Sequence, residues 1–104
     1  MIRRAFVMRL KKGCAREYKR RHDAIWPELT AELAAAGLFD YSIFLDEATG
    51  VLFAIQKLRE DHTADQLVNC PVVQRWFDFM ADILETEPDN TPRYSALQEM
   101  FHMD

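Results

Sequence analysis

Hydrophobic residues recur with two different periods along this chain, and the order of those periods limits the fold more than any other feature. A period of three or four residues predicts helices over 15–36 and 71–84. A period of two, or a run of β-formers, predicts strands over residues 2–10, 41–46, 51–58 and 96–103. The resulting order, β-α-β-β-α-β, is typical of a ferredoxin-like α+β domain with an antiparallel sheet.

The length of 104 residues fits one domain, so we expect residues 1–104 to share a single core. The polar stretch 60–69 is expected to form a short helix. Two helices can cover only one face of the sheet, and the strands carry apolar residues of both parities, such as Phe6 and Val7. We therefore expect a homodimer in which two sheets cover one another.

Pro27 interrupts the first helical pattern. Proline has no N–H to donate to the preceding turn, and it disfavours the helical conformation at the residue before it, Trp26. We expect a break between His22 and Pro27, a second helical segment that begins at Pro27, and a C-cap at Gly37. Such a break would turn His22 and Trp26 away from an ordinary helix surface.

Charge and composition exclude several classes of function. Seventeen acidic and thirteen basic residues give a net charge of −4, so no nucleic-acid partner is expected. No apolar run approaches the roughly 20 residues of a membrane span. Three arginines within 2–10 exclude a signal-peptide core. Cys14 and Cys70 do not make a disulfide framework, and we interpret them as free thiols of a cytoplasmic protein.

The histidines, His22, His62 and His102, are too isolated for a metal site, and no nucleotide-binding glycine motif or nucleophilic serine elbow is present. We therefore expect neither metal nor cofactor. Tyr18 and His22 lie four residues apart on one helix face. A histidine on an apolar face is commonly an interior residue, but the nearby proline break favours a pocket here.

Aromatic residues from the second long helix could close the same pocket. Trp76 and Phe77 are the candidates, although both, and Phe77 in particular, could equally be plain core residues. Beside a histidine that can exchange a proton near neutral pH, aromatic rings suit a small polyol, because they stack on its C–H faces. Arg20 and Arg21 are expected to face solvent or to pair with acidic neighbours.

Motifs along the whole chain resemble the L-rhamnose mutarotase family. The most specific segment comprises Glu17-Tyr18, Arg20-Arg21-His22 and Ile25-Trp26-Pro27-Glu28-Leu29. Supporting matches are Met1-Ile2-Arg3, Ala5-Phe6-Val7-Met8, Tyr41, Ile43, Leu45-Asp46, Leu52-Phe53-Ala54, Gln74-Arg75-Trp76, Pro88-Asp89-Asn90, Pro92, Leu97-Gln98-Glu99 and Phe101. The resemblance implies a dimeric α/β-barrel of ferredoxin-like protomers that interconverts the α and β anomers of L-rhamnopyranose.

On the family pattern, His22 is the proton donor, while Tyr18, Tyr41, Trp76 and Phe77 bind the sugar. One departure is that the family has two tryptophans in the pair at 76 and 77, whereas this chain has Phe77. Phenylalanine keeps an apolar ring but lacks the indole N–H donor. Fold alone would also admit a monooxygenase-like enzyme or a small-molecule-binding module.

Overall fold

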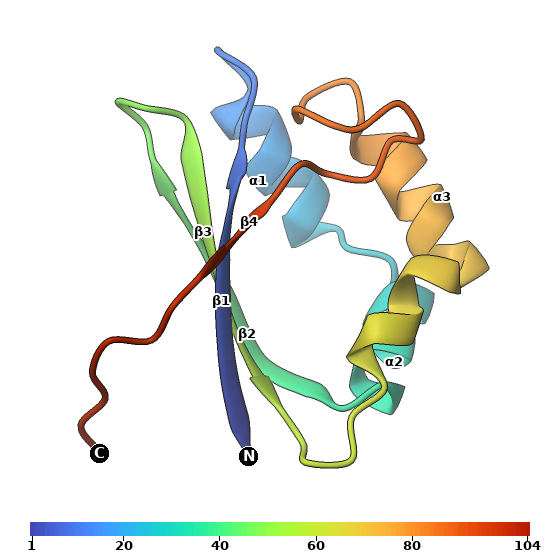
Figure 1. The fold of residues 1–104 in the computed structure, drawn as a ribbon. Coiled ribbons are helices and arrows are strands. Elements are labelled where there is room, and N and C mark those ends of the chain that lie inside the picture. Colours follow the sequence, from blue (N-terminus) through green and yellow to red (C-terminus); the bar gives the residue numbers. More distant parts are fainter.

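The elements follow one another in the expected order (Figure 1). The computed structural model describes residues 1–104. The strands are β1 (Ile2–Arg9), β2 (Leu38–Asp46), β3 (Val51–Leu58) and β4 (Ser95–Leu97). The helices are α1 (Ala15–Asp23), α2 (Pro27–Ala35), the 3₁₀-helix η1 (Ala64–Asn69) and α3 (Pro71–Met80). None of them has the length and hydrophobicity that a bilayer-spanning helix requires.

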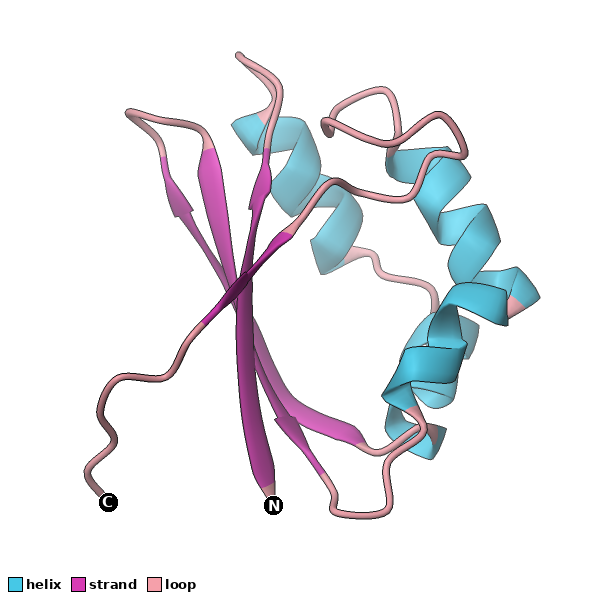
Figure 2. Ribbon diagram, viewed as in Figure 1, coloured by secondary structure: helices cyan, strands magenta, loops and turns pink.

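The four strands form one antiparallel sheet in the order β2-β3-β1-β4. Because β3 lies between β1 and β2, the first β-α-β unit is split, which confirms the ferredoxin-like α+β prediction. The helices all lie on one side of the sheet (Figure 2). Side chains alternate between the two faces of a strand, so each strand has a face toward the helices and a face away from them.

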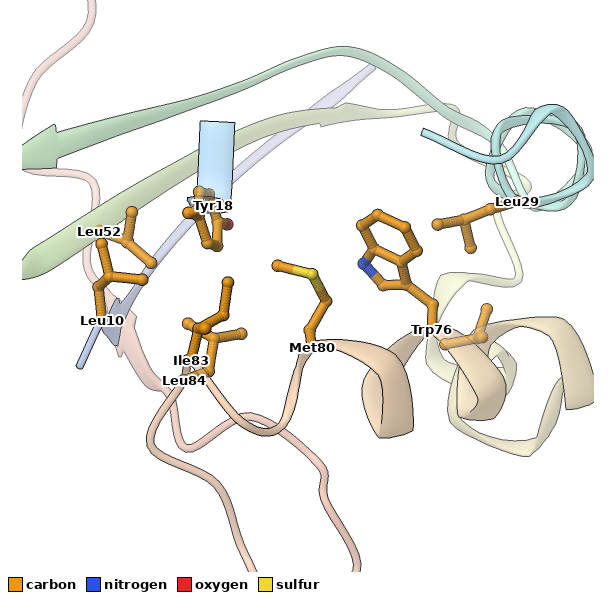
Figure 3. Packing of buried hydrophobic residues seen from close by; sticks show 9 residues of the cluster. Leu10, Tyr18, Leu29, Leu52, Trp76, Met80, Ile83 and Leu84 are labelled. Carbon is orange, nitrogen blue, oxygen red and sulfur yellow. The ribbon is translucent and has the colours of Figure 1, made fainter. Parts of the chain in front are cut away.

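The face toward the helices holds the hydrophobic core. Along β3 the inward residues Leu52, Ala54 and Leu58 are almost completely buried. The main cluster of buried residues joins Leu52 to the helices, as Figure 3 shows, and comprises Leu10, Tyr18, Leu29, Leu52, Val73, Trp76, Met80, Ile83 and Leu84. Leu58 belongs to a second, smaller cluster with Ala36, Leu38 and Ala64. Two candidate site residues, Tyr18 and Trp76, therefore belong to the core as well.

The opposite face of the sheet carries apolar side chains that no helix covers (Figure 2). Phe44 on β2 pairs with Phe53 on β3, and their exposed fractions are 60% and 38%. Ile55 pairs with Ala5 of β1, which in turn pairs with Leu97 of β4, and both Ile55 and Leu97 are exposed. A contiguous apolar face of this kind is typical of an interface rather than of a free surface.

The predicted break at Pro27 is confirmed. Helix α1 ends at Asp23, and α2 begins at Pro27, which occupies the first helical turn. Trp26 is extended, with φ −63° and ψ 128°, as expected for a residue before proline. Gly37 follows α2 with φ +97°, the left-handed conformation that suits a glycine after a helix.

Several element boundaries differ from the prediction. Helix α3 ends at Met80 rather than Leu84, because the next residues pair with the segment that follows β1. Leu84 forms a β-bridge with Leu10, and the carbonyl of Ile83 accepts a hydrogen bond from the backbone N–H of Lys11. The last strand covers only Ser95–Leu97 instead of 96–103, because β1 pairs with just these three residues. The polar stretch 60–69 forms a 3₁₀-helix over its second half.

Strand β2 begins at Leu38, three residues before the expected start, and contains a β-bulge. Phe39 pairs with Lys57 and Ser42 with Ile55, so Asp40 and Tyr41 together lie opposite the single residue Gln56. Asp40 has a positive φ of 46°. A bulge bends its strand and re-aims the side chains beside it. Here it brings Tyr41 alongside Gln56 at the inner face.

Candidate active site

A cavity of about 1740 Å³ lies between the inner face of the sheet and the helices. This volume exceeds the roughly 300–1,000 Å³ of an ordinary ligand site, so a monosaccharide would fill only part of it. All five residues predicted for the site line the cavity: Tyr18, His22, Tyr41, Trp76 and Phe77. The cavity wall is mostly apolar, so its polar side chains, among them Tyr18, His22 and Tyr41, are the groups that can orient a ligand.

Helix α1 places Tyr18 and His22 side by side. They lie one turn apart, and their rings stack with centroids 4.3 Å apart and planes inclined by 26°. Tyr18 is buried and His22 half-buried. Because the helix ends one residue after His22, the imidazole lies at the helix terminus, next to the extended segment that carries Trp26.

Helix α3 contributes the aromatic wall. The Trp76 ring is nearly perpendicular to the rings of His22 and Trp26, with centroid distances of 5.3 Å and 5.1 Å. Such edge-to-face contacts are the favoured geometry for aromatic pairs. Figure 3 shows the indole nitrogen of Trp76 and the hydroxyl of Tyr18 on the sides that face the space between the sheet and α3. An indole N–H and a phenol are therefore both available to a ligand in this space.

The proton on His22 can be assigned from its hydrogen bond. Nδ1 lies 3.1 Å from the carbonyl oxygen of Tyr18. A carbonyl can only accept, so Nδ1 carries the hydrogen and Nε2 is the nitrogen left to exchange a proton with a ligand. Burial lowers the pKa of His22, although the hydrogen bond to Tyr18 and the charge of Asp23 oppose that shift.

The two tyrosines of the cavity stay protonated near neutral pH. Burial raises the pKa of Tyr18, and the neighbouring Tyr41 raises it further. Burial also raises the pKa of Tyr41, against the opposing effects of Gln56 and Arg4. Tyr41 as a whole residue remains 37% exposed and lines the cavity. Both phenols can thus donate hydrogen bonds to a polar ligand.

Phe77 is placed differently from the other four residues. It is half-buried, lines the cavity and packs against the core cluster, but it forms no ring pair with His22, Trp26 or Trp76. The structure therefore brings Tyr18, His22 and Trp76 into ring contact and places Tyr41 across from Tyr18. Phe77 supplies only a further part of the apolar wall.

Arg21 fastens α1 to the end of α3 behind the site. Its side chain is 10% exposed and donates to Glu17 at 2.7 Å, to Asp82 at 2.8 Å and to the carbonyl of Phe79 at 2.8 Å. Arg20 also pairs with Glu17, so the predicted acidic partners of both arginines are confirmed. The two guanidinium groups hold the pKa of Glu17 at about 2. A charge-assisted network of this kind fixes the distance between His22 and the aromatic wall.

Few other residues could bind a metal or act as a nucleophile. No three His, Cys, Asp or Glu side chains come together as a metal site. Cys14 and Cys70 are free and half-buried, and both pack against the core cluster. Each precedes a helix without capping it through its side chain. Packing, rather than reactivity, accounts for both positions.

Comparisons with known proteins agree along the full length. The family model described as L-rhamnose mutarotase matches residues 3–103. The chain belongs to the L-rhamnose mutarotase family. It is 53% identical over 103 residues to an L-rhamnose mutarotase of Flavobacterium johnsoniae, covering 99% of this chain and 96% of that protein. It is 51% identical over 104 residues to one of Bacteroides thetaiotaomicron, with both chains fully covered.

A solved structure extends the agreement to the fold. The crystal structure of L-rhamnose mutarotase from Formosa agariphila superposes with a TM-score of 0.93 at 47% identity, and it covers 100% of both chains. Membership of this family of isomerases, or aldose anomerases, favours the mutarotase hypothesis over the two alternatives that the fold alone admits.

Sequence reasoning missed two polar residues of the cavity, Arg4 and Gln56. Gln56 is only 4% exposed and occupies an inward position of β3 between Ala54 and Leu58. That position could have been noticed, because a polar residue interrupts the apolar side of an alternating strand. Nothing in the sequence indicated its partners, which come from two other strands.

Proposed function

We propose that this chain interconverts the α and β anomers of L-rhamnopyranose in the cavity between the sheet and the helices. The observation that carries the proposal is the hydrogen bond from His22 Nδ1 to the Tyr18 carbonyl, which leaves Nε2 to exchange a proton beside a phenol and an indole. Full-length membership of the family names the sugar.

In the proposed reaction, His22 is the proton donor to the ring oxygen. The proton passes from Nε2 to that oxygen, the bond between it and the anomeric carbon breaks, and water takes the proton of the anomeric hydroxyl. The resulting aldehyde rotates about its bond to the next carbon. Reclosure on the other face returns the protons in reverse order. One positioned general acid contributes roughly 10²- to 10⁴-fold.

The proposed binding residues divide into donors and walls. Tyr18, Tyr41 and the indole of Trp76 donate to sugar hydroxyls, while Trp76 and Phe77 present apolar surface. L-Rhamnose carries a methyl group where most hexoses carry a hydroxymethyl, and an apolar wall favours it. A difference of one small group is worth only about 1–3 kcal/mol, so related sugars should react more slowly rather than not at all.

Polarimetry on freshly dissolved α-L-rhamnose tests the proposed function. The protein should speed the approach to the equilibrium rotation in proportion to its concentration, beyond the buffer background. D-Glucose under the same conditions is the control for specificity. A rate that does not depend on protein concentration would contradict the proposal.

The pH profile tests the role of His22. Because burial lowers its pKa, the donating imidazolium form should gain population only below the ordinary value of about 6.5. The protein-dependent rate should therefore rise as the pH falls through an inflection below 6.5. NMR exchange spectroscopy of the two anomeric protons measures this rate after subtraction of buffer catalysis. A rate that falls toward low pH would mean that neutral His22 acts first as a base.

We further propose that residues 1–104 act as a single domain within a cytoplasmic homodimer. The apolar outer face around Phe44, Phe53 and Ile55 supports a second copy as the covering partner, since sheets of two protomers can stack there. Light scattering at micromolar concentration should report about twice the mass of one chain. Phe53→Asp should shift the protein toward the monomer, and a monomeric parent protein would contradict the proposal.

A further inference from the structure

Three polar residues form a row across the inner face of the sheet, one from each of three neighbouring strands. Arg4 of β1 is the direct cross-strand partner of Gln56 of β3. The bulge of β2 sets Tyr41 opposite Gln56 on the other side. All three line the cavity that holds His22. A buried glutamine costs stability unless its amide is satisfied, so its contacts are informative.

The hydrogen bond from Arg4 fixes which way the Gln56 amide points. Arg4 Nε lies 3.0 Å from Gln56 Oε1. A guanidinium has donors but no acceptor, so only the amide oxygen can face it. The NH₂ group of Gln56 must then face away from Arg4, toward Tyr41. Arg4 is itself held by Asp65, whose Oδ1 lies 3.3 Å from its Nη1.

The direction of the amide sets the direction of the Tyr41 hydroxyl. An NH₂ group can only donate, so in a contact with the phenol oxygen of Tyr41 the amide of Gln56 is the donor. In agreement, hydrogen bonding from the Gln56 side chain lowers the pKa of Tyr41. The Tyr41 hydrogen is thereby left to point into the cavity. We propose that Arg4 and Gln56 are positioning residues that make Tyr41 an obligate donor to a sugar hydroxyl. Successive donors along such a chain also polarise one another.

This inference rests on the proposed function, and a conservative substitution tests it. In Gln56→Glu, one carboxylate oxygen can still accept from Arg4, while the other accepts the hydroxyl of Tyr41 and withdraws its hydrogen from the cavity. The KM for L-rhamnose should rise about three- to tenfold, the effect of one lost hydrogen bond, with kcat changed less than twofold.

A double-mutant cycle separates positioning from a structural role. In a Tyr41→Phe background there is no hydroxyl to orient, so adding Gln56→Glu should change KM less than twofold. Arg4→Met provides a second double-mutant cycle at a position more exposed than Gln56. Its effect on KM should likewise vanish in the Tyr41→Phe background. Arg3→Met is the matched control, because Arg3 is the neighbouring arginine of β1, pairs with Glu99 and does not line the cavity, so its replacement should change KM less than twofold.

A titration without sugar tests the hydrogen-bond chain from Arg4 through Gln56 to Tyr41 independently of the catalysed reaction. The ultraviolet absorbance of tyrosinate, with Tyr41→Phe as the subtraction, reports the ionisation of Tyr41 among the three tyrosines. Gln56→Glu should shift that ionisation to higher pH, because a donor to the phenolate is lost and an acceptor is gained. Equal KM effects in both backgrounds, or an unshifted titration, would overturn the inference. An inactive parent protein that shows the shift would instead overturn only the proposed function.

Discussion

Replacing His22 by alanine should slow L-rhamnose anomerisation by roughly two to four decades, because general acid catalysis by one positioned group contributes about that much. The effect should appear in kcat more than in KM, since in the proposed mechanism the imidazole transfers the proton while Tyr18, Tyr41 and Trp76 bind the sugar. Polarimetry and NMR exchange spectroscopy both measure the loss. A folded His22→Ala protein with nearly unchanged rates would show that another group carries the proton.

A matched control is available in His62→Ala. His62 is half-buried like His22, but it lies outside the cavity, where its Nδ1 accepts from the backbone of Ala64. Its replacement should leave the anomerisation rate within about twofold. Circular dichroism and thermal melting on both variants separate lost chemistry from lost folding. His22→Ala also removes the stacking with Tyr18 and the edge contact with Trp76, so a modest drop in melting temperature is expected.

Much of this site could be predicted because it depends on local rules. The spacing of Tyr18 and His22 puts them on one face of any helix, and Pro27 forces the helix to end near them whatever the rest of the chain does. The extended Trp26 follows from the same proline. These relations depend on residues that are close in the sequence, which is why the structure confirms them.

The parts that could not be predicted depend on partners distant in the sequence. Helix α3 ends at Met80 because residues 83 and 84 pair with the end of β1, and no signal near residue 80 anticipates that. The row of Arg4, Gln56 and Tyr41 needs strand register and a bulge, and a shift of one residue would turn each side chain to the other face. Period-two patterns identify strands but not which residues become neighbours across them.

Trp76→Ala should weaken L-rhamnose binding at least tenfold and destabilise the protein, because Trp76 is both an aromatic wall and a core residue that is 8% exposed. Truncating a buried tryptophan typically costs about 3–5 kcal/mol, a large part of the roughly 5–15 kcal/mol that stabilises a domain. Binding should therefore be measured well below the melting temperature, by titration calorimetry. Trp76→Phe keeps most of the packing and removes the N–H, so it should weaken binding only about two- to twelvefold.

Phe77→Trp completes this comparison and should change the affinity for L-rhamnose less than about threefold. Phe77 lines the cavity without a ring partner, and the cavity has room for a larger ring, so an indole there adds surface without displacing the wall. If its N–H reached a sugar hydroxyl, one neutral hydrogen bond would add about 0.5–1.5 kcal/mol, or two- to twelvefold in affinity. A larger effect from Phe77→Trp than from Trp76→Ala would mean that residue 77, not residue 76, faces the sugar. The contact of Trp76 with His22 argues against that ranking, because a sugar that receives a proton from His22, as proposed, must lie beside the ring that His22 touches.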